Sequence, residues 1–146
     1  MTIFVFPGQG SQHIGMAKDF YDKFDIAKKT FNEIEEYVNL DLKKIIFDNK
    51  EGLLDITNYT QISIFTASLT IFKTILDVTE LDQKNINFVL GHSLGEYSAL
   101  ACSNKINLED CSKILKKRGD LMNNAVTPNK TGMAALIGLS SKDVQN

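Results

Sequence analysis

The sequence has too few cysteines and too little excess charge for several classes of protein. Its two cysteines, Cys102 and Cys111, do not have the spacing of metal ligands, and two are too few for a disulfide framework. We interpret both as reduced core thiols, which is typical of a cytoplasmic protein. A net charge of -2 leaves no basic surface of the kind that binds nucleic acid. We therefore expect no metal and no nucleic-acid partner.

Targeting and membrane segments are also missing from the pattern. The chain passes from Met1 directly into a strand-like run at residues 3–6, with no charged leader and no apolar signal core. The longest uncharged stretch, residues 57–72, is interrupted by hydroxyl and amide side chains and is too short for a membrane span. We therefore expect no membrane partner.

What the sequence does contain is an alternation of strand-like and helix-like segments, which is typical of an α/β fold with a mainly parallel sheet and flanking helices. Strands are predicted at residues 3–6, 86–90 and 133–139, and helices at residues 14–24, 26–37, 42–47, 57–76, 94–103 and 108–122. The strand at 86–90 shows almost no polar alternation. Both faces of the sheet around it are therefore predicted to be covered.

The C-terminal pattern ends unfinished. Residues 140–144 have the features of a helix start, with a serine at the cap and Asp143 in the first turn. We expect one domain over residues 1–127 and the beginning of a second unit over 128–146, in a chain that is truncated from a longer protein. A natural terminus at Asn146 is the alternative.

A serine lies between two glycines at the predicted strand-to-helix junction. The letters GHSLG at residues 91–95 fit G-x-S-x-G, directly after a strand and directly before a helix. In that context a sharp turn exposes the hydroxyl of Ser93, and the amide of Leu94 faces a developing oxyanion. Ser93 is therefore a candidate nucleophile. Ser93 and Glu96 also fit the S-x-x-E capping box, which would give the serine a structural role.

A second glycine-rich loop, PGQGSQ at residues 7–12, follows the first strand. It fits neither G-x-G-x-x-G nor a P-loop, so phosphate binding is poorly supported. Loops after neighbouring parallel strands gather at one edge of a sheet. We therefore expect this loop to face Ser93, with a backbone N–H near Gln9 as a second oxyanion donor. A simple tight turn is the alternative.

One arginine falls on the apolar face of a predicted helix. Cys111, Leu115, Arg118 and Met122 are spaced by four, three and four residues, which places them on one side. A cation that faces inward must be paired, because unpaired burial is very costly. The partner is either a structural Asp or Glu, or the carboxylate of a bound substrate, which suits the guanidinium fork.

No convincing base accompanies the serine. His13 starts the first predicted helix, and His92 adjoins Ser93, where neighbouring side chains point in different directions. A serine nucleophile needs a positioned base. The gap therefore agrees with a truncated chain.

Four segments, in this order, carry a family resemblance: FVFPGQGSQHIGMAKDFY, TNYTQISIFTASLTIF, GHSLGEYSALAC, and KKRGDLMNNAV followed by TGMAALIGL. They closely resemble the N-terminal half of bacterial malonyl-CoA:acyl carrier protein transacylases, in the acyltransferase family of fatty acid and polyketide synthesis. The resemblance implies an α/β-hydrolase-like core that is truncated at the start of a small ferredoxin-like subdomain. Residues 133–139 would be the first strand of that subdomain.

The resemblance also implies roles for individual residues. Ser93 matches the family's acyl-accepting serine, and Gln9 and Leu94 match its two backbone oxyanion donors. Arg118 matches the arginine that pairs with the malonyl carboxylate. His92 matches a histidine that lines the site without acting as the base.

The chain differs from the family pattern in two respects. Gln61 matches the glutamine of the family's TQPA motif, although Ile62 replaces the proline here. The family's catalytic histidine and the residue that orients it lie in sequence that this chain lacks. We therefore expect the chain alone to be inactive or very weakly active.

The implied activity is transfer of a malonyl group from coenzyme A to the pantetheine thiol of acyl carrier protein, through an ester on Ser93, in fatty acid biosynthesis. The implied partners are malonyl-CoA and acyl carrier protein, with no cofactor. One alternative is a serine hydrolase with an α/β-hydrolase or patatin-like sheet, in which water is the acceptor. Another is a non-catalytic fragment that docks the carrier protein through Lys113, Lys116 and Lys117.

Overall fold

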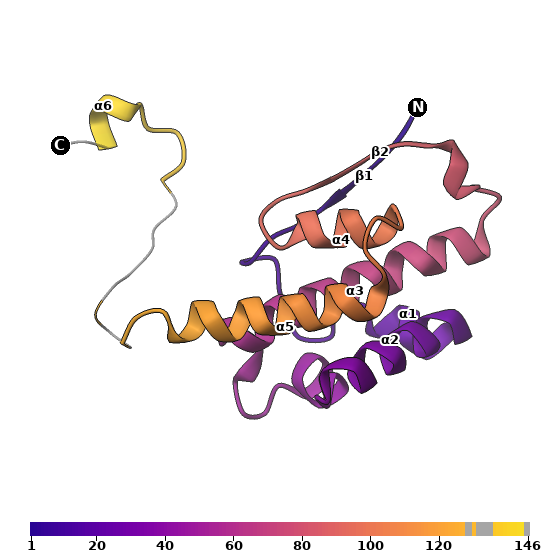
Figure 1. Cartoon of the computed structure of the whole chain (residues 1–146), viewed down its shortest axis with the longest axis horizontal. Coiled ribbons are helices and arrows are strands. Elements are labelled where there is room, and N and C mark those ends of the chain that lie inside the picture. Colours follow the sequence, from indigo (N-terminus) through magenta and orange to yellow (C-terminus); the bar gives the residue numbers. More distant parts are fainter. Residues whose placement is uncertain (128–129, 131–135, 145–146) are drawn as a thin grey trace.

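The computed structural model describes residues 1–127, 130 and 136–144. Its elements in chain order are β1 (Thr2–Phe6), α1 (Lys18–Lys23), α2 (Asp25–Val38), the π-helical turn η1 (Lys44–Asp48), the 3-10 turn η2 (Leu53–Asp55), α3 (Thr57–Val78), the 3-10 turn η3 (Gln83–Asn85), β2 (Ile86–Gly91), α4 (Gly95–Cys102), α5 (Leu108–Asn124) and α6 (Ser141–Val144). Figure 1 shows the two strands beside α4, with α3 and α5 running below them. The small parallel sheet with flanking helices confirms the predicted α/β class.

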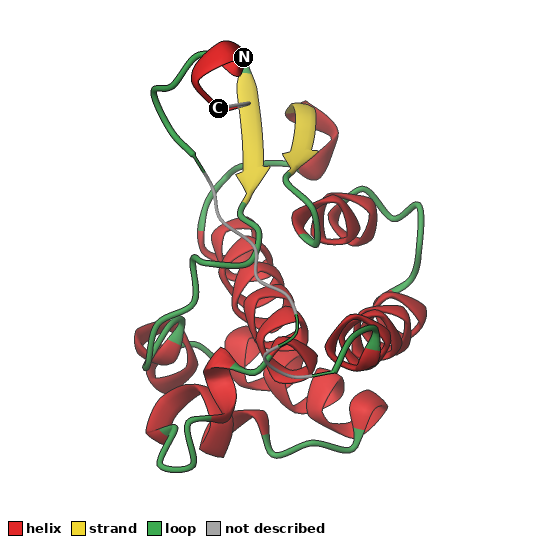
Figure 2. Cartoon of the chain, turned by 90° about the vertical axis from the view of Figure 1, so that its left-hand side faces the viewer, coloured by secondary structure: helices red, strands yellow, loops and turns green. Residues whose placement is uncertain are grey.

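The two strands run parallel and end together. Thr2 lies opposite Ile86 and Phe6 lies opposite Gly91, so both strands deliver their following loops to the same edge (Figure 2). The inner face of β1 packs on α3, where the rings of Phe4 and Phe72 meet edge to face at 5.0 Å. This shared edge is where the glycine-rich loop and the GHSLG segment meet.

The outer face of the sheet is not covered by the described chain. Ile3, Val5, Phe88 and Leu90 share this face through the strand register and are between 41% and 70% exposed. The prediction that both faces are covered is therefore wrong for these residues. The apolar pattern on both faces is real, but only one face has helices packed against it.

The central element is α3, which packs against both α2 and α5, and those two helices also contact each other (Figure 1). Nearly all its residues from Thr60 to Thr74 are buried. Three of its buried threonines, Thr60, Thr66 and Thr74, donate their hydroxyls to nearby carbonyls, as in the 2.7 Å bond from Thr66 Oγ1 to Ile62 O. Within the described part of the chain, α3 alone has the length and composition of a membrane span, and 61% of that stretch is buried inside the fold. Its packing is that of a core helix.

Most predicted elements are confirmed to within a few residues. The first helix is shorter than predicted, because Gly15 (φ 82°) and Ala17 (φ 61°) adopt left-handed backbone and delay its start to Lys18. Residues 42–47 form a helical turn that becomes π-helical from Lys44. Residues 133–135 of the predicted third strand lie outside the described residues, and residues 136–139 are not in a strand.

The predicted helix start near the C-terminal end is confirmed. In α6, Ser140 Oγ donates to Asp143 Oδ2 at 2.6 Å, and Asp143 N donates back to Ser140 Oγ at 3.3 Å. This reciprocal cap satisfies a free amide at the helix start. The proposed domain boundary between residues 127 and 128 stays a prediction.

Candidate active site

Ser93 lies in a tight turn between a strand and a helix. β2 ends at Gly91 and α4 begins at Gly95, so only three residues separate the two elements. The serine has φ 56°, in the left-handed region that a residue with a Cβ rarely adopts. Strain of this kind concentrates at functional sites, where the surrounding structure holds it in place. The structure thus places Ser93 in the strand–turn–helix context that the motif predicted.

The two glycines of the motif allow backbone segments to touch. A Cβ on Gly91 would lie 2.0 Å from the carbonyl carbon of Gly95. A Cβ on Gly95 would lie 2.3 Å from the carbonyl oxygen of Phe6, at the end of β1. Real Cβ atoms do not approach this closely, so the turn can close on itself and on β1 only with glycine at both positions.

The capping-box interpretation of Ser93 is wrong. The N-cap residue of α4 is Leu94, and no side chain caps this helix. The hydroxyl of Ser93 instead accepts a hydrogen bond from Nη2 of Arg118 at 3.1 Å. The side chain therefore points away from its own helix and toward α5.

The glycine-rich loop after β1 lies directly against the turn, as predicted. Gly8 is buried, and a Cβ there would lie 2.6 Å from Nδ1 and 2.9 Å from the carbonyl oxygen of His92. The amide of His92 donates to Phe6 O at 3.1 Å, which joins the end of β1 to the turn. The loop is also attached to α3, because Gln9 Nε2 donates to Thr57 Oγ1 at 3.3 Å.

Two backbone donors remain available at this junction. Across residues 1–127, neither the amide of Gln9 nor that of Leu94 donates a hydrogen bond to another described residue. One amide follows the buried Gly8, and the other follows Ser93 at the approach to α4. Free amides in such positions are suited to hold a developing oxyanion. That role for Gln9 and Leu94 stays a prediction.

Arg118 reaches the site from α5 and contacts α3, α4 and the turn between β2 and α4. Its Nη1 donates to Gln61 Oε1 on α3 at 2.5 Å, and its Nη2 donates to Ser93 Oγ. Its Cζ lies 5.9 Å from the ring centroid of Tyr97 on α4, within range of a cation–π contact. The guanidinium is half-buried among these neutral groups.

No structural carboxylate neutralises Arg118 in the part of the chain that the structure describes. The eight ion pairs found among the described side chains are all formed by lysines, and none of them includes Arg118. Of the two alternatives that the sequence left open, an internal Asp or Glu is therefore not found among the described residues. The arrangement instead leaves a positive charge beside the candidate nucleophile, where it can receive an anion.

Close packing between α5 and α3 brings Arg118 to Gln61. A Cβ on Gly119 would lie 2.9 Å from Asn58 Cα, so the two helices touch where α3 begins. The predicted apolar face of α5 is confirmed in its first half, where Cys111 and Leu115 are fully buried. Met122 is 40% exposed, so the face opens to solvent just beyond Arg118.

Neither histidine is a partner of the serine. His13 is exposed and its Nδ1 lies 3.4 Å from Ser11 O, and His92 is exposed beside Gly8. Within the described residues, the hydroxyl of Ser93 has only Arg118 as a hydrogen-bond partner. No three His, Cys, Asp or Glu side chains of these residues are grouped to hold a metal.

Two contributors to the site were not found by sequence reasoning. Tyr97 was not singled out, although its position four residues after Ser93 on α4 offered a signal. Met122 was assigned only to an apolar stripe, but its Sδ accepts a hydrogen bond from Gln61 Nε2 at 2.9 Å. That contact joins positions far apart in the sequence and leaves no local pattern.

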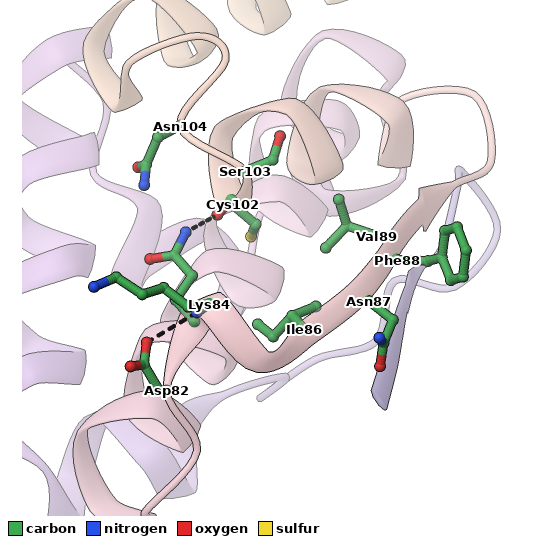
Figure 3. A pocket seen from close by; sticks show the side chains of 10 residues that line it. Asp82, Lys84, Ile86, Asn87, Phe88, Val89, Cys102, Ser103 and Asn104 are labelled. Atoms are coloured by element: carbon green, nitrogen blue, oxygen red, sulfur yellow. Dashed lines mark hydrogen bonds between the residues drawn. The ribbon is translucent and has the colours of Figure 1, made fainter. Parts of the chain in front are cut away.

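A cavity of about 560 Å³ lies elsewhere, along the outer edge of β2 (Figure 3). It is lined by η3, β2 and the end of α4, where Gln83 Nε2 donates to Cys102 O at 2.5 Å. None of the candidate site residues lines it. The candidate site is therefore the junction around Ser93 rather than this cavity.

Comparison with known proteins places this geometry among acyltransferases. Residues 3–145 match the family described as acyl transferase domain. A malonyl CoA-acyl carrier protein transacylase of Bacillus subtilis is 40% identical over 134 residues, which are 92% of this chain and 32% of that protein. Among solved structures, an acyl-carrier-protein-S-malonyltransferase from Bartonella henselae has a TM-score of 0.91 and 38% identity, over 99% of this chain and 46% of that one.

A second solved structure holds a malonyl-transacylase in complex with a type II PKS acyl-carrier protein. It has a TM-score of 0.79 and 34% identity, over 86% of this chain and 40% of the matched one. The chain spans between 32% and 43% of the length of the Bacillus subtilis relatives that it matches.

Proposed function

The chain belongs to the acyl transferase domain family, and we propose that it is the nucleophile-bearing part of an enzyme that moves a malonyl group from coenzyme A to acyl carrier protein in fatty acid biosynthesis. The match over residues 3–145 confirms the family resemblance of the four sequence segments. One observation carries the proposal: the hydroxyl of Ser93 lies 3.1 Å from the guanidinium of Arg118, which has no acidic partner among the described residues. A nucleophile and a carboxylate receptor are thus within reach of a single malonyl group.

In the first half-reaction, Ser93 Oγ attacks the thioester carbonyl of malonyl-CoA while a base takes the hydroxyl proton. The carbonyl oxygen becomes an oxyanion between the amides of Gln9 and Leu94, and each such donor typically contributes about 3 to 4 kcal/mol of transition-state stabilisation. Collapse of the tetrahedral intermediate breaks the carbon–sulfur bond. Coenzyme A leaves as the thiol after it takes the proton, and a malonyl ester remains on Ser93.

In the second half-reaction, the pantetheine thiol of acyl carrier protein attacks the ester carbonyl and gives up its proton. The same two amides hold the oxyanion, and Ser93 leaves as the restored hydroxyl. Support for these partners comes from the names of the relatives and from the solved complex with a carrier protein. We propose that the enzyme uses no cofactor in either half-reaction and that it acts in the cytoplasm.

Arg118 selects the acyl group in this scheme. Without substrate, its Nη2 donates to Ser93 Oγ. A malonyl carboxylate would accept that donor and gain a charge-assisted bond, which a neutral acyl group cannot form. His92 lines the same junction beside Gly8 without acting as the base.

The base is assigned to sequence outside this chain. Neither histidine of the chain hydrogen-bonds the hydroxyl of Ser93, and the relatives that the chain matches are longer. We propose that residues 1–127 are the N-terminal part of the acyltransferase domain and that residues 128–146 begin a small ferredoxin-like subdomain. The chain alone is then inactive or very weakly active.

The direct test mixes the full-length protein that contains this sequence with malonyl-CoA and measures its intact mass. A malonyl adduct that maps to the peptide with Ser93, and that is absent from Ser93→Ala, is the expected result. An unmodified wild-type serine, with malonyl-CoA still intact, would overturn the proposal.

The two alternatives receive less support. Hydrolysis does not require an inward cation, so it leaves the arginine that Gln61 binds without a role. Steady hydrolysis of malonyl-CoA without carrier protein would favour the hydrolase hypothesis. Carrier docking through lysines is weakened by their pairing, since Lys113 and Lys116 bond Glu109 and Asp120 on the same helix. Carrier binding that survives loss of these lysines would remove that idea.

A further inference from the structure

The amide of Gln61 is completely buried, and each of its two ends has one partner. Its Oε1 accepts from Nη1 of Arg118 at 2.5 Å, and its Nε2 donates to Sδ of Met122 at 2.9 Å. Both partners belong to α5, where a spacing of four residues places them on one face. A single side chain of α3 therefore connects two consecutive turns of α5.

The orientation of this amide follows from donor and acceptor chemistry. A guanidinium has only donors, so it must meet the oxygen of Gln61 and not the nitrogen. The nitrogen then needs an acceptor of its own, because a buried N–H without a partner is costly. The thioether of Met122 supplies that acceptor. Rotating the amide by half a turn would put N–H groups against N–H groups at Arg118.

Charge gives the contact a second consequence. Gln61 is a neutral acceptor, so it holds one edge of Arg118 without cancelling the positive charge. Tyr97 lies against the guanidinium face, and Nη2 is left to point at Ser93 Oγ. The guanidinium is thus held at one edge by Gln61 and lies over the Tyr97 ring, while the edge nearest the nucleophile bonds only the serine hydroxyl, which an anion can replace.

We propose that Gln61 and Met122 form a positioning pair that aims the charged Nη2 edge of Arg118 at the carboxylate of an acyl group on Ser93. This inference rests on the proposed function, since it deepens the role given to Arg118. Neither residue touches the reacting atoms, so both act through the arginine. The pair sets the preference for an acyl group with a free carboxylate over a neutral one.

The test uses the full-length protein and follows acylation of Ser93 by malonyl-CoA and by acetyl-CoA at varied concentration. In Gln61→Glu, the new carboxylate pairs with Arg118 and cancels its charge while keeping the side-chain volume. Malonyl kcat/KM should fall about 100-fold, mainly through KM, because a charge-assisted hydrogen bond is lost. The acetyl reaction, which does not use the arginine, should change less than about threefold.

A milder variant tests the methionine. Met122→Leu keeps the apolar volume and removes the acceptor for Gln61 Nε2. We expect malonyl KM to rise about three- to tenfold, on the scale of one weak hydrogen bond, with acetyl KM unchanged. Met16→Leu is the matched control, because Met16 is a buried thioether near β1 that does not contact the site. Gln83→Leu is a second control, because it removes an amide that donates to Cys102 O, away from the candidate site.

The outcomes separate this inference from the function on which it rests. If the wild type forms no malonyl ester, both fall. If the wild type acylates and Arg118→Ala loses the malonyl preference, but Gln61→Glu and Met122→Leu keep the wild-type ratio of malonyl to acetyl rates, only the positioning pair is overturned. Equal loss of both rates in the variants would assign Gln61 to fold stability alone and would also overturn it.

Discussion

The carboxyl ends of β1 and β2 differ sharply in packing from the outer face of the same sheet. At the edge where β1 and β2 end, Gly8, Gly91 and Gly95 allow backbone segments to touch with no room for a methyl group. On the outer face, Val5 and Phe88 are more than half exposed. Both regions are built from the same two strands. The backbone of the sheet region is therefore packed most closely where the candidate nucleophile lies.

The largest effect is expected from filling the tight edge. Gly95→Ala would force a methyl group against Phe6 O, so we expect a loss of about 3 kcal/mol in the free energy of unfolding, at the upper end of overpacking costs. Val5→Ala on the outer face should change it by less than about 0.5 kcal/mol. Urea unfolding of the two variants measures the contrast. Similar losses at both positions would show that the two regions are packed equally closely.

Removal of the cation tests chemistry at the same edge. Arg118→Ala should lower malonyl transfer about 100-fold, because it deletes a charge-assisted bond to the substrate carboxylate. Acetyl transfer should be nearly unchanged, so the ratio of the two rates is the measurement. An unaltered ratio would return Arg118 to a structural role. Lys113→Ala, which removes an exposed cation of the same helix, is the control.

Relief of backbone strain at Ser93 should increase stability, by less than Gly95→Ala decreases it. Ser93→Gly replaces a side chain held at φ 56° with a residue that adopts this conformation freely, so we expect stability to rise by about 1 kcal/mol. The variant should form no ester. Thermal unfolding beside Ser93→Ala separates strain from loss of the hydroxyl. A melting temperature equal to that of Ser93→Ala would mean that the turn stores no strain.

The effect that is smallest at neutral pH, and that appears only in alkaline solution, concerns the buried thiols. Burial raises the pKa of Cys111 from 9.0 to about 11 and raises that of Cys102 as well. The unfolded chain therefore releases these protons at lower pH than the fold does. Their contribution to stability is complete below about pH 9 and is lost as pH rises toward 11. Urea midpoints at pH 8 and pH 10, compared with a Cys111→Ala variant, measure it. A variant with the same pH dependence as the wild type would contradict the assignment.

Local patterns predicted the elements that carry the site, but not what joins them. The GHSLG segment indicated a turn between strand and helix because strand, glycines and helix formers are adjacent in the sequence. The spacing on α5 placed Arg118 on an inward face. Its actual partner, Gln61, lies 57 positions earlier and depends on how α3 and α5 cross, which no local period encodes. The resemblance matched Gln61 to the family without giving it a contact.

Other differences have equally physical causes. The apolar pattern of Phe88 and Leu90 predicted burial, but a pattern says only that a face is suited to burial and not whether the chain supplies the cover. The helix predicted from residue 14 starts later because Ala17 takes a left-handed conformation that periodicity does not register. The capping box failed at Ser93 because the hydroxyl has a stronger, charged donor in Arg118.

The first turns of α3 have a mechanical consequence for the whole junction. Thr57 receives the side chain of the Gln9 loop, Asn58 meets Gly119, and Gln61 holds Arg118. These three contacts lie on one helix. The rise per residue of that helix therefore sets the spacing between the Gln9 loop and Arg118. An insertion between Asn58 and Gln61 would turn Gln61 off the face that meets Arg118 while Thr57 keeps its contact with Gln9, so the junction would lose its alignment without losing any of its side chains.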